Sequence, residues 1–277
     1  MRFDWYSATI AAPIDDLLGV LSKGLGGKIE EGRGIHGYQR SFRLEKGGSL
    51  AALVLAGGPN GDPHAEAHGD STGEFVSLVR DHFHGKHYVT RIDSAEDFDG
   101  PGSWERLSAA ALRAADSEVP VLKVSQAGDF HRGLDGRTLY VGSFKSDTFV
   151  RVYEKGKQVN GGLPLDQPRV SPDWVRVEAV VRPKGEARHH AATIAPADAW
   201  GFSNTLRRVG EHVLNSQAPR YDMKVHRVTD NEKAFSFMCQ QYARVLTEMR
   251  ISEGSWSKIG KRIARTIAAI DSGQKKS

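Results

Sequence analysis

The chain has a single cysteine and no long apolar run. Cys239 is the only cysteine among 277 residues, which excludes an intramolecular disulfide and any metal cluster built from several cysteines. Its place in a helix-like run favours a small buried hydrophobe over a nucleophile. No apolar run approaches the roughly 20 residues that a membrane-spanning helix needs, and the N-terminus lacks the layout of a signal peptide. We therefore expect a cytoplasmic protein with no membrane partner.

Two common catalytic motifs are also absent. Gly57-Gly58 is not followed by the Lys-Ser/Thr pair of a nucleotide-binding loop, and no Gly-x-Ser-x-Gly elbow occurs. The composition, with 39% hydrophobic and 26% charged residues, is that of a soluble globular protein. The length allows one large or two modest domains.

The net charge of +4 is unevenly placed. Residues 251–277 carry six basic and two acidic side chains, which accounts for the whole excess. Basic tails commonly bind polyanions, although a solvated basic tail without a partner is the ordinary alternative. The candidate DNA-binding residues here lie largely on one side of a predicted helix, opposite a row of isoleucines: Lys258, Lys261, Arg262 and Arg265.

Hydrophobic periodicity predicts an α+β protein with antiparallel sheets, helices packed on one side, and a helical basic C-terminal section. Strands are expected at 3–10, 38–44, 50–55, 64–68, 88–93, 149–155 and 174–181. Helices are expected at 13–25, 73–82, 103–115, 196–215, 234–250 and 257–270.

The order of these elements hints at an internal duplication. A strand, a helix, further strands and another helix occur roughly twice, and Asp4 and Asp93 each lie in a strand that precedes a helix. We expect one domain at 1–215, with half-repeats at about 1–85 and 86–215. Residues 216–277 would form a separate helical region for DNA binding or dimerisation.

Two alternating runs are the most informative part of the sequence. Successive residues of a strand point to opposite faces, so 149–155 and 174–181 each have a valine side and a polar side. If the two strands pair, the polar side presents Tyr153, Glu178, Arg151 and Arg176. A phenol among guanidinium groups and a carboxylate suits covalent chemistry on a phosphodiester. A charge ladder on a solvated face, with the tyrosine as a packing residue, is the ordinary alternative.

One tyrosine competes with Tyr153 as a nucleophile. Tyr140 precedes a Gly-Ser turn and lies in a strand-like run between Leu139 and Val141. We interpret Tyr140 as a core residue.

Other polar groups have a spacing that suits a metal ion. His64, Glu66 and His68 share one strand face, although solvated edge residues explain the same pattern. Asp93 and Asp97 form an acidic pair of the kind that Mg²⁺ or Mn²⁺ takes, although the spacing alone favours a surface ion pair with Arg91 and a turn-forming acid. Three histidines near the end of the helix at 73–82 are interpreted as surface residues: His82, His84 and His87.

Four motifs occur in the order seen in one known family: Thr90–Asp93 with Asp97, Leu139–Ser146, Arg151–Lys155 and Trp174–Glu178. Together they resemble the replication initiation factor family, the rolling-circle replication initiators of plasmids, filamentous phages and conjugative elements. Shorter matches at Phe3–Trp5 and His64–Gly69 extend the resemblance over roughly residues 3 to 185.

The resemblance implies a metal-dependent, strand-specific nicking and joining endonuclease. A tyrosine attacks a phosphodiester, stays linked to the 5′-phosphate and leaves a 3′-hydroxyl for a host polymerase. The family's Arg-x-Tyr pattern falls on Arg151 and Tyr153. Its acidic ligands for Mg²⁺ or Mn²⁺ fall on Asp4 and Asp93, with two further candidates, Glu66 and Glu178.

The same resemblance implies the partners. The DNA would be a replication origin, single-stranded at the nick and held by Lys145, Lys155 and Arg176. A host helicase and polymerase, and a homodimer, are further expectations. This chain lacks the basic insertions of larger plasmid initiators, so the sequence does not place the recognition of the origin.

Three alternatives remain open at this point. A conjugative relaxase would use the same chemistry to start DNA transfer. A non-catalytic repressor would use the basic C-terminal helix, and an RNA-binding protein would use a stacking sheet without cleavage.

Overall fold

The computed structural model describes the whole chain except residues 118, 134, 165–166, 222–229 and 275–277, and two lysines of the basic tail, Lys275 and Lys276, fall outside it. The chain divides into two units, 1–225 and 226–277, which are described separately.

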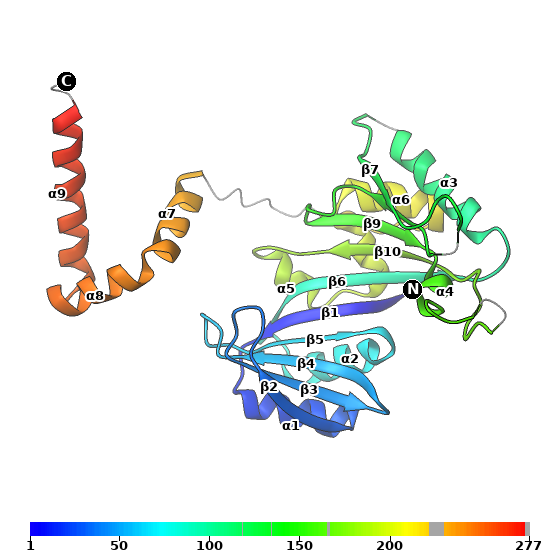
Figure 1. Ribbon diagram of the computed structural model, residues 1–277, viewed down its shortest axis with the longest axis horizontal. Coiled ribbons are helices and arrows are strands. Elements are labelled where there is room, and N and C mark those ends of the chain that lie inside the picture. Colours follow the sequence, from blue (N-terminus) through cyan, green and yellow to red (C-terminus); the bar gives the residue numbers. More distant parts are fainter. Residues whose placement is uncertain (118, 134, 165–166, 222–229, 275–277) are drawn as a thin grey trace. The chain divides into compact units, whose positions relative to one another are not determined.

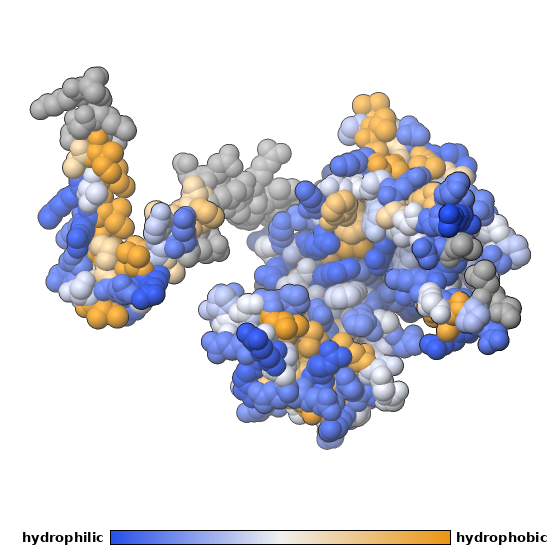
Figure 2. Space-filling view, viewed as in Figure 1, coloured by the Kyte–Doolittle hydropathy of each residue, from blue (hydrophilic) through white to orange (hydrophobic). Residues whose placement is uncertain are grey.

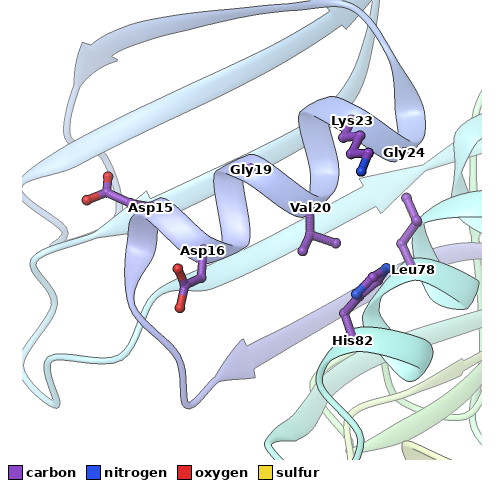
Figure 3. Close-up of a pocket in the computed structure, with 8 residues that line it drawn as sticks. All are labelled: Asp15, Asp16, Gly19, Val20, Lys23, Gly24, Leu78 and His82. Atoms are coloured by element: carbon purple, nitrogen blue, oxygen red, sulfur yellow. The ribbon is translucent and has the colours of Figure 1, made fainter.

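The first unit is built on one ten-stranded sheet in which every neighbouring pair is antiparallel (Figure 1). Its strands are β1 (Arg2–Ile10), β2 (Lys28–Arg33), β3 (Arg40–Lys46), β4 (Ser49–Ala56), β5 (His64–His68), β6 (His87–Phe98), β7 (Val124–Ala127), β8 (Thr138–Val141), β9 (Thr148–Tyr153) and β10 (Val175–Val181). Its helices are α1 (Ile14–Leu25), α2 (Thr72–His82), α3 (Ser103–Asp116), α4 (Lys155–Val159), α5 (Ala187–Ala191) and α6 (Asn204–Leu214), with short 3₁₀ turns η1 (Gly69–Ser71) and η2 (Pro196–Gly201).

The sheet is made of two halves with the same order. From the centre outward, one half runs β1, β5, β4, β3, β2 and the other runs β6, β10, β9, β8, β7. In each half a central strand is followed by a helix, and the chain then enters at the outer edge and returns strand by strand to the centre. The arrangement is the one expected of an internal duplication.

The helices of this unit cover one face of the sheet. Buried side chains of α1, α2, α3, α5 and α6 join a single apolar cluster. Five of the six valines of β9 and β10 belong to that cluster, namely Val150, Val152, Val175, Val177 and Val181. The face opposite the cluster carries Asp93, Arg151, Tyr153, Arg176 and Glu178, and is called the polar face below.

Some elements differ from those predicted. The helix expected at 196–215 is divided into η2 and α6, because the Ser203 hydroxyl accepts a hydrogen bond from the Leu206 amide and starts a new helix. Four elements were missed, β2, β7, α4 and α5, because they are short or polar and carry little periodicity.

The interpretation of His87 as a surface residue was wrong. His87 opens β6 and is 3% exposed. One ring nitrogen bonds the Phe83 carbonyl at 2.9 Å and the other bonds the Tyr6 hydroxyl at 3.1 Å. The residue is therefore part of the interior, whereas His82 and His84 are exposed.

The second unit consists of α7 (Asp230–Gln241), α8 (Ala243–Glu253) and α9 (Trp256–Gln274). The single helix predicted at 234–250 is interrupted at Tyr242, whose φ of −107° and ψ of 16° are not helical. The four basic residues of this unit that are proposed for DNA binding are exposed on α9, and Arg262 also pairs with Glu253 at 2.7 Å. Among the described residues, no helix is long and apolar enough to cross a membrane.

Candidate active site

The candidate site lies where β9 pairs with β10. The register sets Tyr153 opposite Arg176 and Arg151 opposite Glu178. Alternation sends the β-branched residues between them into the core, which fixes the register because a slip of one residue would bury the charges. The sequence pattern predicted this division of faces on the condition that the two strands pair, and the pairing is observed.

Tyr153 is buried on the polar face rather than in the apolar core. Its hydroxyl donates a hydrogen bond to Glu178 Oε1 at 2.5 Å. The Arg151 guanidinium lies 4.7 Å from the ring centroid and Lys155 Nζ lies 5.8 Å from it. The side chain is only 6% exposed. Burial and the neighbouring Glu178 carboxylate raise the pKa of the Tyr153 phenol, because both disfavour phenolate.

Two fully buried carboxylates, Glu178 and Asp93, lie beside Arg151. Glu178 accepts hydrogen bonds from Arg151, one of them from Nε at 2.9 Å. Asp93 is held by both arms of Arg91, at 2.9 and 2.6 Å, and lies 4.0 Å from Arg151. Burial raises the pKa of Glu178 although Arg151 acts in the opposite direction. A carboxylate with a raised pKa is a better proton acceptor than an ordinary one.

Arg176 forms the centre of a second ion cluster. It donates to Asp97 at 2.6 and 3.1 Å and lies 2.7 Å from Asp4. The Trp174 indole also donates to Asp97, at 2.7 Å. Burial raises the pKa of Asp97, but the hydrogen bonds from Arg176 and Trp174 outweigh it and hold that pKa below its usual value.

Arg176, which was predicted to contact DNA, is buried in this arrangement. Its side chain is 2% exposed, and its guanidinium is occupied by the two aspartates. Arg176 is therefore a structural cation beneath the site. Arg151 remains the arginine within reach of a ligand, with 30% of its side chain exposed.

The carboxylates do not form a metal cage here. Asp93, Asp4 and Glu178 are each engaged by an arginine, and a hard cation needs several free oxygen ligands. Within the described part of the chain, no group of three or more His, Cys, Asp and Glu side chains is placed to hold a metal ion. The donor atoms suit Mg²⁺ or Mn²⁺, but their arrangement does not, because guanidinium groups already occupy them.

Glu66, the fourth predicted metal ligand, lies in the other half of the sheet. It is on β5, where it pairs with Ser7 and Leu53. Burial raises its pKa, and its charged neighbours are His68, Arg91 and His36. The structure therefore does not bring Glu66 to Tyr153.

The interpretation of Tyr140 as a core residue was also wrong. Tyr140 pairs with Arg151 across β8 and β9, so it lies on the polar face, while Leu139 and Val141 enter the core. The alternation of Leu139, Tyr140 and Val141 contains this information. Tyr140 lies against the rings of Phe144 and Phe149, whereas the Tyr153 hydroxyl is bonded to Glu178, so Tyr153 is the better-placed candidate nucleophile.

Sequence reasoning missed an anchor just after the tyrosine. Glu154 is buried and accepts hydrogen bonds from the Arg137 side chain, two of them at 2.9 and 2.8 Å. Lys157 also lies 3.0 Å from Glu154. Burial raises the pKa of Glu154, but the hydrogen bonds from Arg137 prevail and lower it. The anchor fixes the backbone next to Tyr153.

The two predicted DNA-binding lysines of this unit differ in setting. Lys145 is exposed in the turn between β8 and β9. Lys155 is half-buried beside Tyr153, and burial lowers the pKa of its amine. Lys155 therefore adjoins the candidate site, and contact of either lysine with DNA stays a prediction.

Comparisons with known proteins agree with this arrangement. A family model described as replication initiation factor matches residues 87–250. A solved structure titled as a rolling circle replication initiator protein from Geobacillus stearothermophilus has a similar fold, with a TM-score of 0.52 and 19% identity. That similarity covers 80% of this chain and 98% of the other chain. No curated protein matches the sequence.

The family match spans more than half of the chain, including β6, β9 and β10 with Arg151, Tyr153 and Glu178. The resemblance found in the sequence motifs is therefore confirmed, and this chain belongs to the replication initiation factor family.

Proposed function

We propose that this protein is a rolling-circle replication initiator that nicks one strand of its origin, with Tyr153 as the nucleophile. The observation that carries the proposal is the hydrogen bond from the Tyr153 hydroxyl to the buried Glu178 carboxylate, with Arg151 against both. A nucleophile, a base and a phosphate-binding cation thus meet at one point.

The chemistry is an exchange of one phosphodiester for another. The Tyr153 oxygen forms a bond to phosphorus, and the bond from phosphorus to the 3′-oxygen breaks. Glu178 accepts the phenol proton, and the departing 3′-oxygen takes a proton from water. Since the phosphotyrosine link is itself a phosphodiester, it retains the bond energy, and attack of a 3′-hydroxyl on the phosphorus releases the tyrosine and rejoins the strand.

Arg151 would couple DNA binding to this step. In the free protein its guanidinium is held by Glu178, which lowers the basicity of that carboxylate. A phosphodiester has two oxygens that can accept hydrogen bonds from the same planar guanidinium group of Arg151. If Arg151 turns toward the phosphate, Glu178 loses its counter-charge and becomes a stronger base when substrate is present. Movement of Arg151 or Lys155 would also uncover the buried phenol.

A requirement for Mg²⁺ or Mn²⁺ stays a prediction from the sequence. In the observed arrangement a cation could bind Asp93 or Asp4 only if an arginine moved away. Nicking in EDTA, in Mg²⁺ and in Mn²⁺ tests this point separately from the identity of the nucleophile. Activity that persists in EDTA would end the metal proposal and leave the tyrosine proposal intact.

The main test uses supercoiled DNA that carries the replicon encoding this chain. The wild-type protein should convert it to an open circle with protein covalently attached to a 5′ end, and Tyr153→Phe should abolish the adduct while DNA affinity is retained. A conjugative relaxase would pass the same test only on a transfer origin. A non-catalytic repressor would give no adduct with either protein, which would overturn the proposal.

A further inference from the structure

The turn between β8 and β9 displays an aromatic side chain that the catalytic proposal does not use. Phe144 is 53% exposed at the tip of this hairpin. The turn is closed by a hydrogen bond from the Ser146 amide to the Ser143 carbonyl at 2.8 Å. Arg182 donates to the carbonyls of Phe144 and Ser146, at 3.0 and 3.2 Å. The exposed ring is therefore carried by a well-anchored turn rather than by a loose loop.

Phe144 belongs to a small aromatic patch on the polar face, consisting of Tyr140, Phe144, Phe149 and Arg182. The ring of Tyr140 lies 6.4 Å from that of Phe144 and 6.2 Å from that of Phe149. The Arg182 guanidinium lies 5.3 Å from the centre of the Phe149 ring. Phe144 is the ring of this patch that faces solvent, because Tyr140 is half-buried and Phe149 is only 5% exposed. An exposed aromatic side chain beside cations is suited to stacking on a base.

The patch is continuous with the candidate active site. Tyr140 is directly opposite Arg151, and Phe149, Arg151 and Tyr153 follow one another on the same face of β9. At about 3.3 Å per residue, Phe149 lies about 13 Å along the strand from Tyr153. A nucleic-acid strand whose phosphate reaches Tyr153 would therefore place its next few bases over the patch.

The charges around the patch suit a polyanion with exposed bases. Arg182 and Lys145 adjoin the aromatic rings, and Arg151 lies between the patch and Tyr153. Asp147, the acid of the turn, is neutralised by Lys184 at 2.6 Å. Cations that follow a backbone, with aromatic rings that stack on bases, are the two elements of single-strand binding.

We propose that the aromatic patch is a stacking platform for single-stranded DNA on one side of the scissile phosphate, with Phe144 as its main base contact. The proposal rests on the nicking function above, because it needs a strand at Tyr153. It adds a site for the unpaired bases next to the nick, which the catalytic residues themselves do not provide.

The test separates base stacking from charge attraction. Binding is measured by fluorescence anisotropy with the full chain carrying Tyr153→Phe, so that no cleavage interferes. The probes are oligo-dT and an abasic oligomer of equal length, about 12 nucleotides, which has the same charge but no bases. In this background Phe144→Ala should weaken binding of oligo-dT about tenfold and leave binding of the abasic oligomer unchanged.

Two control variants sharpen the result. Lys145→Ala should weaken binding of both oligomers equally. It should also lower the slope of log affinity against log salt concentration by about 1, because one phosphate contact is lost. Phe130→Ala removes a similarly exposed phenylalanine, 45% exposed and packed on Trp104, and should change neither affinity. If Phe144→Ala weakens binding of both oligomers equally, or changes the binding of neither, the patch is not a stacking platform and the proposal is overturned. Because the readout needs no cleavage, failure of nicking and failure of stacking are told apart.

Discussion

The two halves of the sheet share a topology but differ in the side chains on the polar face. Where β10 and β9 pair Glu178 with Arg151, β5 and β4 pair Glu66 with Leu53. The next pair along is Arg176 with Tyr153 in one half and His64 with Leu55 in the other. The glutamate is present in both halves, whereas the arginines and the tyrosine occur in one. The sheet therefore supplies positions, and reactivity depends on what occupies them.

The largest functional difference between the two halves is expected at Tyr153. Tyr153→Phe removes the attacking oxygen, and we expect nicking to fall by at least about 10³-fold. Tyr38→Phe, which alters a half-buried tyrosine stacked on His64 in the first half, should nick normally. Adduct formation on supercoiled DNA measures both. Equal losses in the two variants would mean that Tyr153 is not the nucleophile.

The paired glutamates offer the next comparison. Glu178→Gln removes the proton acceptor but keeps the shape, and it should lower the nicking rate by about 10²- to 10⁴-fold with DNA affinity retained. Glu66→Gln should leave the rate within about twofold, because no nucleophile contacts Glu66. Single-turnover rates decide between them. A large loss from Glu66→Gln would contradict the assignment and support a role for the first half in the reaction.

Stability should differ between buried and exposed ion pairs of the two halves. Arg176→Met leaves Asp4 and Asp97 without their buried cation, and we expect a loss of about 3–5 kcal/mol in the free energy of unfolding. Arg40→Met removes an exposed partner of Glu31 in the first half and should cost at most about 1 kcal/mol. Urea denaturation of both variants provides the measurement. Similar losses would show that the Arg176 cluster is not buried in solution.

The smallest expected effect concerns His64, which occupies the position of Arg176 in the first half. Burial lowers the pKa of His64 to about 4 from an ordinary 6.5. The unfolded chain then takes up a proton below pH 6.5 while the folded chain stays neutral, so stability falls as the pH drops from 6.5 toward 4. His64→Gln should remove up to about 3 kcal/mol of this loss, measured by denaturation at several pH values.

Part of the pH dependence should persist in that variant. The pKa of His87 is lowered in the same direction, chiefly by burial. A His64→Gln protein whose stability falls with pH as steeply as the wild type would show that His64 is solvated.

Alternation in the sequence was sufficient to find the polar face. The period of two in β9 and β10 placed Arg151, Tyr153 and Glu178 together, because strand geometry leaves little choice once the valines are buried. The same rule would have placed Tyr140 correctly. The interpretation of Tyr140 followed the apolar character of its neighbours, whereas alternation along the strand places it on the face opposite to theirs.

Long-range register was beyond the sequence. Asp97 is 79 residues from Arg176, and only the pairing of β6 with β10 brings them together. The sequence suggested Asp93 as a metal ligand because two closely spaced carboxylates, Asp93 and Asp97, are typical of a cation site. An ion pair with Arg91 was the alternative that the same spacing offered, and it is the one observed. The approach of Arg151 could not be seen from the sequence, because Arg151 lies on a separate strand, β9.

All seven residues of β10 are buried, and the strand is hydrogen-bonded on both sides, to β6 and to β9. Backbone amides in such a strand exchange with deuterium only when a large part of the protein opens. The scaffold beneath Glu178 is thus among the last regions to open, and slow local melting cannot serve as an on–off control. Changes in activity would therefore come from side-chain rotations on the polar face, over a backbone that stays in place.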